Sequence, residues 1–496
     1  MSEFNLRIPG WDGTALAADA HLPDPAHWPV PTVVTRTPYG RTGHLAEGRG
    51  WTARGFAYVV QDVRGRYDSD GVWECYRNER GDGAALADWI AAQPWSDGHL
   101  IGYGGSYSGY TAWALAAERP ERVPALVSLG PSMAMHRTKF EGGVLRLAEH
   151  AAWWLARADG RTSRDDLVGA VFHNRPELLA HLPVVELPEA MGVRLPGFRE
   201  VIEAGPYARP DQEITERELA ALPVAGLHVG GWYDLLAEET FRLWRQVGTA
   251  LPQRPPQQLV VGPWGHDLAF AGRTAVGDRE HGPESLLDLG GLAVTWIRDV
   301  LAGRATSGTR VFHLAADVWE AWPEQTTTDT LHAHRDGTLQ PVTAMLGAFF
   351  THDPEDPYPT LPPGADRRTL DARPDALRFV TDRQDGRTVI GASVELDGSA
   401  PVADVDWVVR LVEVTADGRA FDLGRGCARG TGPHRIPLSP FAVTPGPGSR
   451  LRLEISGADF PRLARSLGTG ADRYTTTRTA PVRQTVHTAA LHLELS

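Results

Sequence analysis

Residues 101–113, IGYGGSYSGYTAW, decide the fold class that the sequence predicts. Two glycines precede Ser106, and Gly109 follows it three positions later. An apolar run lies upstream and an alanine-rich, helix-like segment lies downstream at 111–118. Strand, tight turn and helix are the context of a nucleophile elbow, in which a strained turn exposes the serine Oγ beside a helix N-terminus. The alternative is a glycine-rich turn with an incidental serine, because Ser108 stands where the G-x-S-x-G motif has its last glycine.

Composition limits the classes of function. A chain of 496 residues predicts two or three domains, and 42% hydrophobic with 22% charged residues is typical of a soluble globular protein. The net charge of −13 argues against nucleic acid and against an anionic membrane surface as partners. Sixteen tryptophans suggest an aromatic-lined pocket, although many could simply belong to the core.

The cysteine count and the N-terminal sequence indicate a cytoplasmic protein. Cys75 and Cys427 lie far apart, with neither a CxxC motif nor a metal-ligand spacing, so we expect two reduced thiols. The segment MSEFNLRIPGWDG has no apolar core of a secretory signal, and no apolar run is long enough to span a bilayer.

The first part of the chain alternates strand-like and helix-like segments. Apolar runs at 31–36 and 56–61 are separated by segments of helical periodicity, which predicts a parallel sheet covered by helices. This alternation stops where helix-like segments broken by prolines take over. We therefore expect an α/β catalytic domain at 1–135 and 224–306, interrupted by a helical cap at 136–223.

The last part of the chain has a different pattern. Short alternating runs such as 310–314, 407–414 and 450–455 are separated by Gly, Pro and Asp turns, with little helix. This pattern predicts an all-β sandwich or jelly-roll domain at 307–496. A lectin-like role would follow only from its shape. We expect this domain to pack on the catalytic domain and to wall one side of the cleft.

Two further strand ends carry the residue types that a serine nucleophile needs. Asp234 follows the apolar run 226–230, and His266 follows the run 258–262. In α/β-hydrolases the triad appears in the order Ser, Asp/Glu, His, each just after a sheet strand. The hypothesis is therefore that Ser106 attacks, His266 acts as base and then acid, and Asp234 orients the imidazole.

Each of these residues has a simpler interpretation. Asp234 could cap the helix expected near residue 237, and His266 is one of 18 histidines. His150 and His228 are rivals on composition. They fall on an expected cap helix and inside an expected strand, so neither occupies the position that a triad requires.

Five short segments occur together in this chain: RTPY at 36–39, QDVRG at 61–65, GGSYSG at 104–109, GWYD at 231–234 and GPWGH at 262–266. With them the chain resembles the cocaine esterase / X-prolyl dipeptidyl-peptidase (CocE/NonD) family of serine hydrolases over nearly its whole length. The resemblance implies an α/β-hydrolase domain with an inserted helical cap, followed by an all-β jelly-roll domain. It also implies an oxyanion hole made by the hydroxyl of Tyr39 and the backbone N–H of Tyr107, although Tyr39 could be a packing residue.

The resemblance also bears on the substrate. Relatives that hydrolyse α-amino acid esters have acidic residues two and three positions after the catalytic aspartate, where this chain has Leu236 and Ala237. We therefore expect an acyl pocket without a buried charge partner. Its apolar or aromatic lining would come from Trp153, Trp154, Trp232 and Leu236, for each of which core packing is the alternative.

The sequence thus predicts a serine hydrolase that cleaves a small-molecule ester or amide through an acyl-enzyme. No metal or organic cofactor is implied. An X-prolyl dipeptidyl aminopeptidase and a biosynthetic acyltransferase or cyclase would use the same chemistry, and a binding protein on the same fold is a fourth possibility. The acyl group, the leaving group and the oligomeric state are not specified by the sequence.

Overall fold

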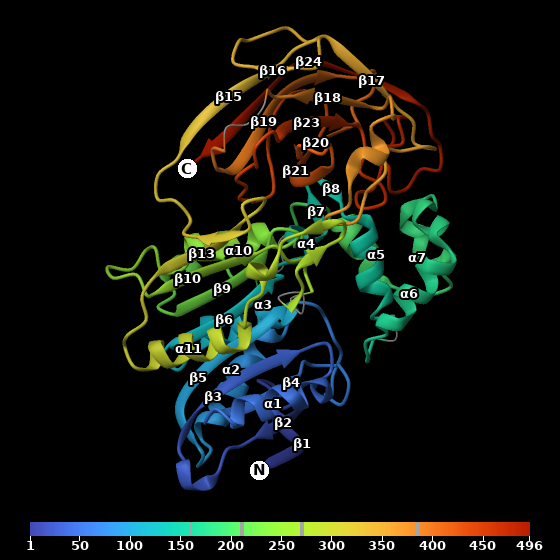
Figure 1. Cartoon of the computed structure of the whole chain (residues 1–496). Helices are drawn as coiled ribbons and strands as arrows, with labels where there is room; N and C mark the ends of the chain where they lie inside the picture. Colours follow the sequence, from blue (N-terminus) through green and yellow to red (C-terminus); the bar gives the residue numbers. More distant parts are fainter. Residues whose placement is uncertain (159, 209–212, 268–271, 383–385) are drawn as a thin grey trace.

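A computed structural model describes residues 1–158, 160–208, 213–267, 272–382 and 386–496. The chain forms an α/β layer at the N-terminal end, a group of helices at its side and an all-β region at the C-terminal end (Figure 1). This arrangement confirms the predicted fold class. No helix of the described residues is long and apolar enough to cross a membrane.

The N-terminal layer is built on a ten-stranded sheet with the order β1-β2-β4-β3-β5-β6-β9-β10-β13-β14. Neighbours from β4 to β13 pair in parallel, and the pairs at the two edges are antiparallel. Central strands such as β4 are buried on both faces, which explains their continuous apolar runs. The strands are β1 Ser2–Pro9, β2 Ala15–His21, β3 Val30–Thr37, β4 Ala57–Asp62, β5 Ser96–Ser106, β6 Ala125–Pro131, β9 Ala225–Gly231, β10 Gln257–Gly262, β13 Gly308–His313 and β14 Val318–Glu320.

Helices cover both faces of this sheet. On one face α2 (Glu79–Ala91), α3 (Tyr107–Glu118) and α10 (Ala237–Gln246) share a buried apolar cluster with the strands. On the other face α1 (Leu45–Thr52) and α11 (Leu289–Leu301) do the same. The sheet is thereby enclosed, and the carboxyl ends of its strands are left as the place for a site.

β13 and β14 fall in the range that the sequence assigned to the C-terminal domain, yet they extend the N-terminal sheet. β13 pairs in parallel with β10, and α11 lies between the two strands in the chain. β10, α11 and β13 form a βαβ unit, in which the strand after the helix pairs in the same sheet as the strand before it. Alternation of apolar residues alone does not distinguish such a strand from one of the following all-β region.

The inserted segment is mainly helical, as predicted. It also contains a short antiparallel hairpin of β7 and β8, which the sequence analysis did not predict because each strand has two residues. Gly142 and Gly143 turn this hairpin at φ of 55° and 84°. The elements are α4 Met135–Lys139, β7 Phe140–Glu141, β8 Val144–Leu145, α5 Leu147–Leu155, α6 Asp165–Asn174, α7 Leu187–Ala190, α8 Pro196–Ala204 and α9 Glu216–Ala221.

The C-terminal region consists of two antiparallel sheets packed on one large apolar core. The first has the order β16-β15-β24-β19-β22, with β17 also paired to β24, and the second has the order β18-β23-β20-β21. Figure 1 shows these strands above the α/β layer. They are β15 Thr327–Ala333, β16 Leu339–Gln340, β17 Ala348–His352, β18 Ala376–Val380, β19 Val389–Ser399, β20 Asp406–Val414, β21 Ala420–Arg429, β22 Gly432–Pro437, β23 Arg450–Ser456 and β24 Val482–Leu495.

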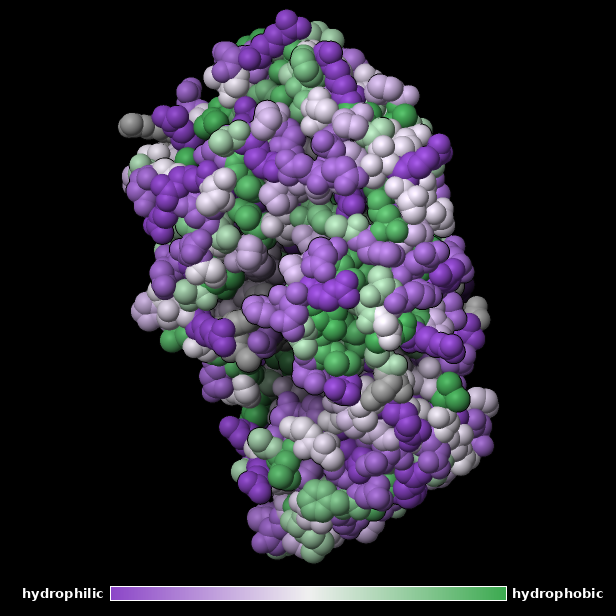
Figure 2. Space-filling model, turned by 90° about the vertical axis from the view of Figure 1, so that its right-hand side faces the viewer, coloured by the Kyte–Doolittle hydropathy of each residue, from purple (hydrophilic) through white to green (hydrophobic). Residues whose placement is uncertain are grey.

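The molecular surface seen in Figure 2 is largely hydrophilic. Apolar residues appear on this face in small groups, and a hollow lies partway along it.

A hairpin of β11 (Ala275–Val276) and β12 (Arg279–Glu280) contacts the C-terminal region through the buried ion pair of Arg279 with Glu413, at 2.6 Å.

Candidate active site

The serine turn lies between β5 and α3. Ser106 ends β5 and has φ of 54° and ψ of −125°, a left-handed conformation that is strained for a residue with a side chain. A Cβ at Gly104 would lie 2.3 Å from the carbonyl oxygen of Ser108, and a Cβ at Gly109 would lie 2.8 Å from Pro131. Glycine is therefore required at 104 and 109, while the side chain of Ser108 is accommodated.

Ser106, His266 and Asp234 form a hydrogen-bonded chain. The Nε2 of His266 lies 3.1 Å from Ser106 Oγ, and its Nδ1 lies 2.9 Å from Asp234 Oδ1. Asp234 and His266 follow the ends of β9 and β10, which lie beside β5 and β6 at the same edge of the sheet. The three positions singled out in the sequence thus converge.

The surroundings of His266 suit a group that gains and loses a proton. Burial disfavours the charged imidazolium, but the Asp234 carboxylate outweighs burial and raises the pKa of His266. The Asp234 side chain is fully buried and also accepts the backbone N–H of Leu236 at 2.8 Å. It accepts the Nδ1–H of His266, which leaves Nε2 as the unprotonated ring nitrogen facing Ser106 Oγ.

The two rival histidines lie elsewhere. His150 is buried in the cap, where its Nε2 donates to the carbonyl oxygen of Phe198 at 3.0 Å, and burial lowers its pKa to about 3. His228 is buried in β9, where its Nε2 lies 2.8 Å from Gln257 Oε1, and burial lowers its pKa to about 4. Both histidines are therefore hydrogen-bonded residues of the packed interior.

Tyr39 approaches Ser106 from the loop after β3. Its hydroxyl lies 3.3 Å from Ser106 Oγ. The loop is fixed by two hydrogen bonds, in which the N–H of Tyr39 donates to Thr37 Oγ1 at 3.0 Å and the hydroxyl of Tyr67 donates to the Tyr39 carbonyl at 2.7 Å. The guanidinium of Arg157 stacks 4.9 Å above the Tyr39 ring.

Tyr107 is the first residue of α3, where backbone N–H groups have no partner within the helix. Its side chain points away from the reaction: the buried hydroxyl donates to the carboxylate of Glu79 and accepts the N–H of Tyr76. These bonds fix the residue at the start of α3.

A cavity of about 90 Å³ adjoins the serine. Trp153 and Leu236, both predicted substrate contacts, line it together with Met135 and His266. Its wall also contains Lys139 and Glu149, whose charged groups lie 2.7 Å apart. The cavity wall therefore contains charged groups, but they pair with each other, and an acyl pocket without a buried charge partner for the substrate stays a prediction. A lysine and a glutamate on separate cap helices look like ordinary surface charges in the sequence.

The other two predicted contacts lie away from this cavity. Trp232 is 4% exposed and its Nε1 donates to the Phe312 carbonyl at 2.7 Å, which places its ring in the core shared with the C-terminal region. Trp154 packs against Gly197 and lines a separate groove between the cap and the α/β layer. The core-packing interpretation holds for Trp232.

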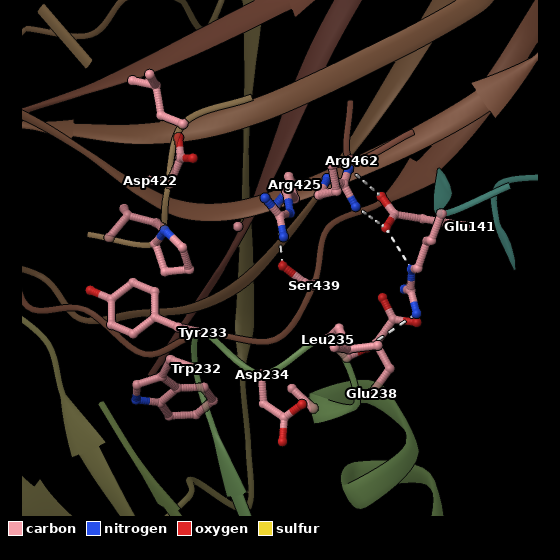
Figure 3. A pocket seen from close by; sticks show the side chains of 16 residues that line it. Glu141, Trp232, Tyr233, Asp234, Leu235, Glu238, Asp422, Arg425, Ser439 and Arg462 are labelled. Atoms are coloured by element: carbon pink, nitrogen blue, oxygen red, sulfur yellow. Dashed lines mark hydrogen bonds and ion pairs between the residues drawn. The ribbon is translucent and has the colours of Figure 1, made fainter. Parts of the chain in front are cut away.

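A second cavity lies behind the loop that carries Asp234 (Figure 3). Trp232, Tyr233 and Asp234 approach it from the end of β9, while Arg425 and Arg462 come from the C-terminal region. Arg462 pairs with Glu141 of the cap hairpin, with Nη2 at 3.1 Å from Oε1. Burial alone would raise the pKa of Glu141, but Arg462 and Arg146 lower it to about 2. The three parts of the chain thus meet directly behind Asp234.

Comparison with known proteins decides the family. Residues 12–267 match the model of the X-Pro dipeptidyl-peptidase (S15) family, and residues 306–493 match its C-terminal non-catalytic domain. The chain belongs to the X-Pro dipeptidyl-peptidase (S15) family. A cocaine esterase from Rhodococcus sp. (strain MB1 Bresler) is 28% identical over 547 aligned positions, which cover 94% of this chain and 92% of that protein. The resemblance seen in the sequence is confirmed, and membership of the S15 family makes this protein a hydrolase.

Solved structures share the S15-family fold over the whole chain. An α-amino acid ester hydrolase superposes with a TM-score of 0.83 at 19% identity, covering 100% of this chain and 96% of the other. An aminopeptidase from a marine sediment Thaumarchaeota archaeon gives a TM-score of 0.82 at 21% identity, with the same coverage. At these identities the likeness concerns the fold alone.

Proposed function

We propose that this S15-family protein is a serine esterase that hydrolyses a small carboxylic ester through an acyl-enzyme on Ser106. The observation that carries the proposal is the continuous hydrogen-bonded chain from Asp234 through His266 to Ser106, with the Tyr39 hydroxyl on the same oxygen. This is the arrangement that acyl transfer to serine needs. The similarity to a cocaine esterase supports ester hydrolysis.

The geometry assigns a role to each group. Ser106 Oγ attacks the ester carbonyl while His266 Nε2 takes its proton, and the Asp234 carboxylate stabilises the imidazolium that forms. The Tyr39 hydroxyl and the Tyr107 N–H donate to the oxyanion. The imidazolium then protonates the departing alcohol. In the second half, His266 takes a proton from the water that attacks the acyl-enzyme. The bond to Ser106 Oγ then breaks, and the imidazolium returns the proton to Oγ as the acid leaves.

The cavity favours a short acyl group. A cavity of about 150 Å³ is known to hold one benzene molecule, and the space beside Ser106 is about 90 Å³. The sequence predicts an apolar or aromatic acyl pocket, and the size of the cavity narrows the proposal to an aliphatic acyl group of few carbons. The His266 ring is 37% exposed, so water reaches the acyl-enzyme and hydrolysis is favoured over transfer to another acceptor.

An X-prolyl dipeptidyl peptidase is the second candidate, because the matching family carries that name. Such an enzyme must bind the free ammonium of a peptide. The carboxylate beside the serine, Glu149, is already paired with Lys139. We therefore place ester hydrolysis first, and comparing an Xaa-Pro anilide with ethyl butyrate separates the two.

The decisive test is covalent labelling. A fluorophosphonate should add one phosphonyl group per chain, mapped by peptide mass to Ser106, and the Ser106→Ala protein should remain unlabelled. Labelling at another serine, or none in a folded enzyme, would refute the proposal. Tyr207→Phe, at a residue 88% exposed on the cap, is a control that should be labelled as the wild type is.

We also propose that the protein acts in a reducing compartment, the cytoplasm. Cys75 and Cys427 are unpaired, and burial raises the pKa of both thiols. Subcellular fractionation followed by thiol labelling under denaturing conditions would test this, since a disulfide-linked or secreted form would contradict it.

A further inference from the structure

The cap places an ion pair in the wall of the cavity beside Ser106. Lys139 is the last residue of α4, and Glu149 lies in the first turn of α5. Lys139 Nζ lies 2.7 Å from Glu149 Oε1 and 4.6 Å from the centre of the Trp153 ring. The Lys139 side chain is only 2% exposed. Both charged groups line the same space as Ser106 and His266.

One oxygen of this pair is unsatisfied. Among the described residues that line the cavity, Glu149 Oε2 is the one buried side-chain atom without a hydrogen-bond partner. Other hydroxyl groups in the cavity wall are satisfied, since Ser132 Oγ lies 2.7 Å from the Tyr76 hydroxyl and 2.8 Å from Thr138 Oγ1. A buried acceptor without a donor costs free energy, so a ligand that donates a hydrogen bond there would relieve this cost.

The charges around Glu149 decide which kind of donor fits. Lys139 neutralises the carboxylate, and the guanidinium of Arg157 lies 5.2 Å from the Trp153 ring. His266 becomes a third cation when it accepts the serine proton. A substrate ammonium would meet these positive charges, whereas a hydroxyl donates to Oε2 without adding charge.

We propose that Glu149 selects esters whose short acyl chain carries a hydroxyl group, which donates to Oε2 while the carbonyl lies at Ser106. The inference rests on the proposed esterase function and names its substrate class. Lys139 orients Glu149 through their ion pair at 2.7 Å, and the small cavity limits the chain length. The preferred substrates are therefore short hydroxyacyl esters and not aminoacyl esters.

Four ethyl esters test the proposed selection of hydroxyacyl groups: butyrate, 2-hydroxybutyrate, 3-hydroxybutyrate and 3-aminobutyrate. The hydrolysis of each ester is followed by titrating the released protons at constant pH. At least one hydroxy ester should exceed butyrate in kcat/KM by on the order of 10- to 100-fold, as a hydrogen bond to a charged acceptor allows. The aminobutyrate should be hydrolysed more slowly than the better hydroxy ester. Equal rates for butyrate and both hydroxy esters, or a preference for the aminobutyrate, would overturn the proposal.

The double variant Lys139→Met/Glu149→Leu removes the donor site without leaving an unpaired charge. The ratio of kcat/KM for the preferred hydroxy ester over butyrate should fall to within about threefold of one, and a ratio that stays at the wild-type value would contradict the role of Glu149. The ratio is the informative readout, because Glu149 raises and Lys139 lowers the pKa of His266, and any change in this pKa affects both esters alike. Glu177→Gln, at a cap residue with a 64% exposed side chain, should keep the wild-type ratio.

The two proposals fail in different ways. If the wild type hydrolyses butyrate and is labelled at Ser106 but shows no preference, only the hydroxyacyl selection is wrong. If it hydrolyses no ester and is not labelled, the esterase function itself is wrong. The wild-type panel decides between these outcomes even if the double variant does not fold.

Discussion

Among the described residues, two side chains lie within hydrogen-bond distance of Ser106 Oγ, His266 at 3.1 Å and Tyr39 at 3.3 Å, and we propose that they serve different steps. The histidine removes a proton at attack. The tyrosine hydroxyl is placed to donate to the charge that develops on the substrate oxygen. Both come from loops that follow parallel strands, so their positions relative to the serine are set by the sheet.

Replacing Tyr39 by phenylalanine should remove one oxyanion donor. We expect kcat to fall by about 10²- to 10³-fold, with a much smaller change in KM, because the hydroxyl acts mainly in the transition state. Steady-state kinetics on ethyl butyrate would measure this. A Tyr39→Phe enzyme with wild-type kcat would assign Tyr39 to packing, and Tyr207→Phe is the matched control on an exposed tyrosine.

The pH dependence should reveal the partner of His266. Only neutral imidazole accepts the serine proton, so kcat/KM falls as the pH drops through the pKa of His266, which Asp234 raises above the ordinary value of 6.5. Asp234→Asn removes that charge, so the acidic limb should move to lower pH while kcat falls by about 10⁴-fold. If the acidic limb of the profile of kcat/KM against pH stays in place or moves to higher pH, Asp234 does not act on the pKa of His266.

The sequence allowed the main residues to be predicted but not the walls of the cavity. Ser106, Asp234 and His266 each follow an apolar strand in the order that the fold requires. Lys139 and Glu149 are ten positions apart on two different cap elements, and no local pattern indicates that they meet. Trp232 was predicted to line the acyl pocket, with core packing as the alternative, and its ring lies in the core shared with the C-terminal region.

At the scale of elements, the contact between β5 and α3 defines the site. Gly104→Ala would place a Cβ 2.3 Å from a backbone oxygen of α3, so the strand and helix must separate. We expect a loss of about 1–3 kcal/mol in the free energy of unfolding, together with a lower kcat. Denaturant unfolding and ester kinetics would measure both effects.

The control for that prediction is Gly169→Ala in α6, where a Cβ would meet nothing within 4 Å. Alanine has the higher helix propensity, so stability should be unchanged or up to about 1 kcal/mol higher. Equal effects of the two substitutions would contradict the claim that close packing at 104 shapes the serine turn.

Strands that are buried on both faces of the sheet could be predicted from the sequence. β4 and β10 are apolar runs between helices, and both were expected near their observed bounds. The two-residue strands β7 and β8 are too short to show alternation, and a strand at the sheet edge such as β14 looks like any half-exposed strand. Their pairing depends on contacts between distant residues, which a local pattern does not contain.

At the scale of the whole molecule, buried ion pairs join the cap to the C-terminal region behind Asp234. Arg462, whose side chain is 13% exposed, contacts both Glu141 and Asp459. Arg462→Met would leave Glu141 with Arg146 and Asp459 with Arg410 as remaining partners, so we expect a loss of about 1–3 kcal/mol in the free energy of unfolding. Activity should fall as well, because the same contacts support the Asp234 loop.

An exposed ion pair provides the control for the Arg462 substitution. Arg435 and Glu395 lie 3.5 Å apart with side chains 71% and 53% exposed, so Arg435→Met should change stability by less than about 1 kcal/mol. Denaturant unfolding of both variants checks the difference. If Arg462→Met were as harmless as Arg435→Met, the C-terminal region would not depend on these contacts for its attachment.

The central claim is that Ser106 forms the acyl-enzyme, and the rate of ester hydrolysis by Ser106→Ala tests it most directly. We predict that kcat for ethyl butyrate falls by at least about 10⁴-fold while the protein stays folded, because the substitution removes the oxygen that attacks the ester carbonyl. A folded Ser106→Ala protein that hydrolyses the ester at the wild-type rate would contradict the account.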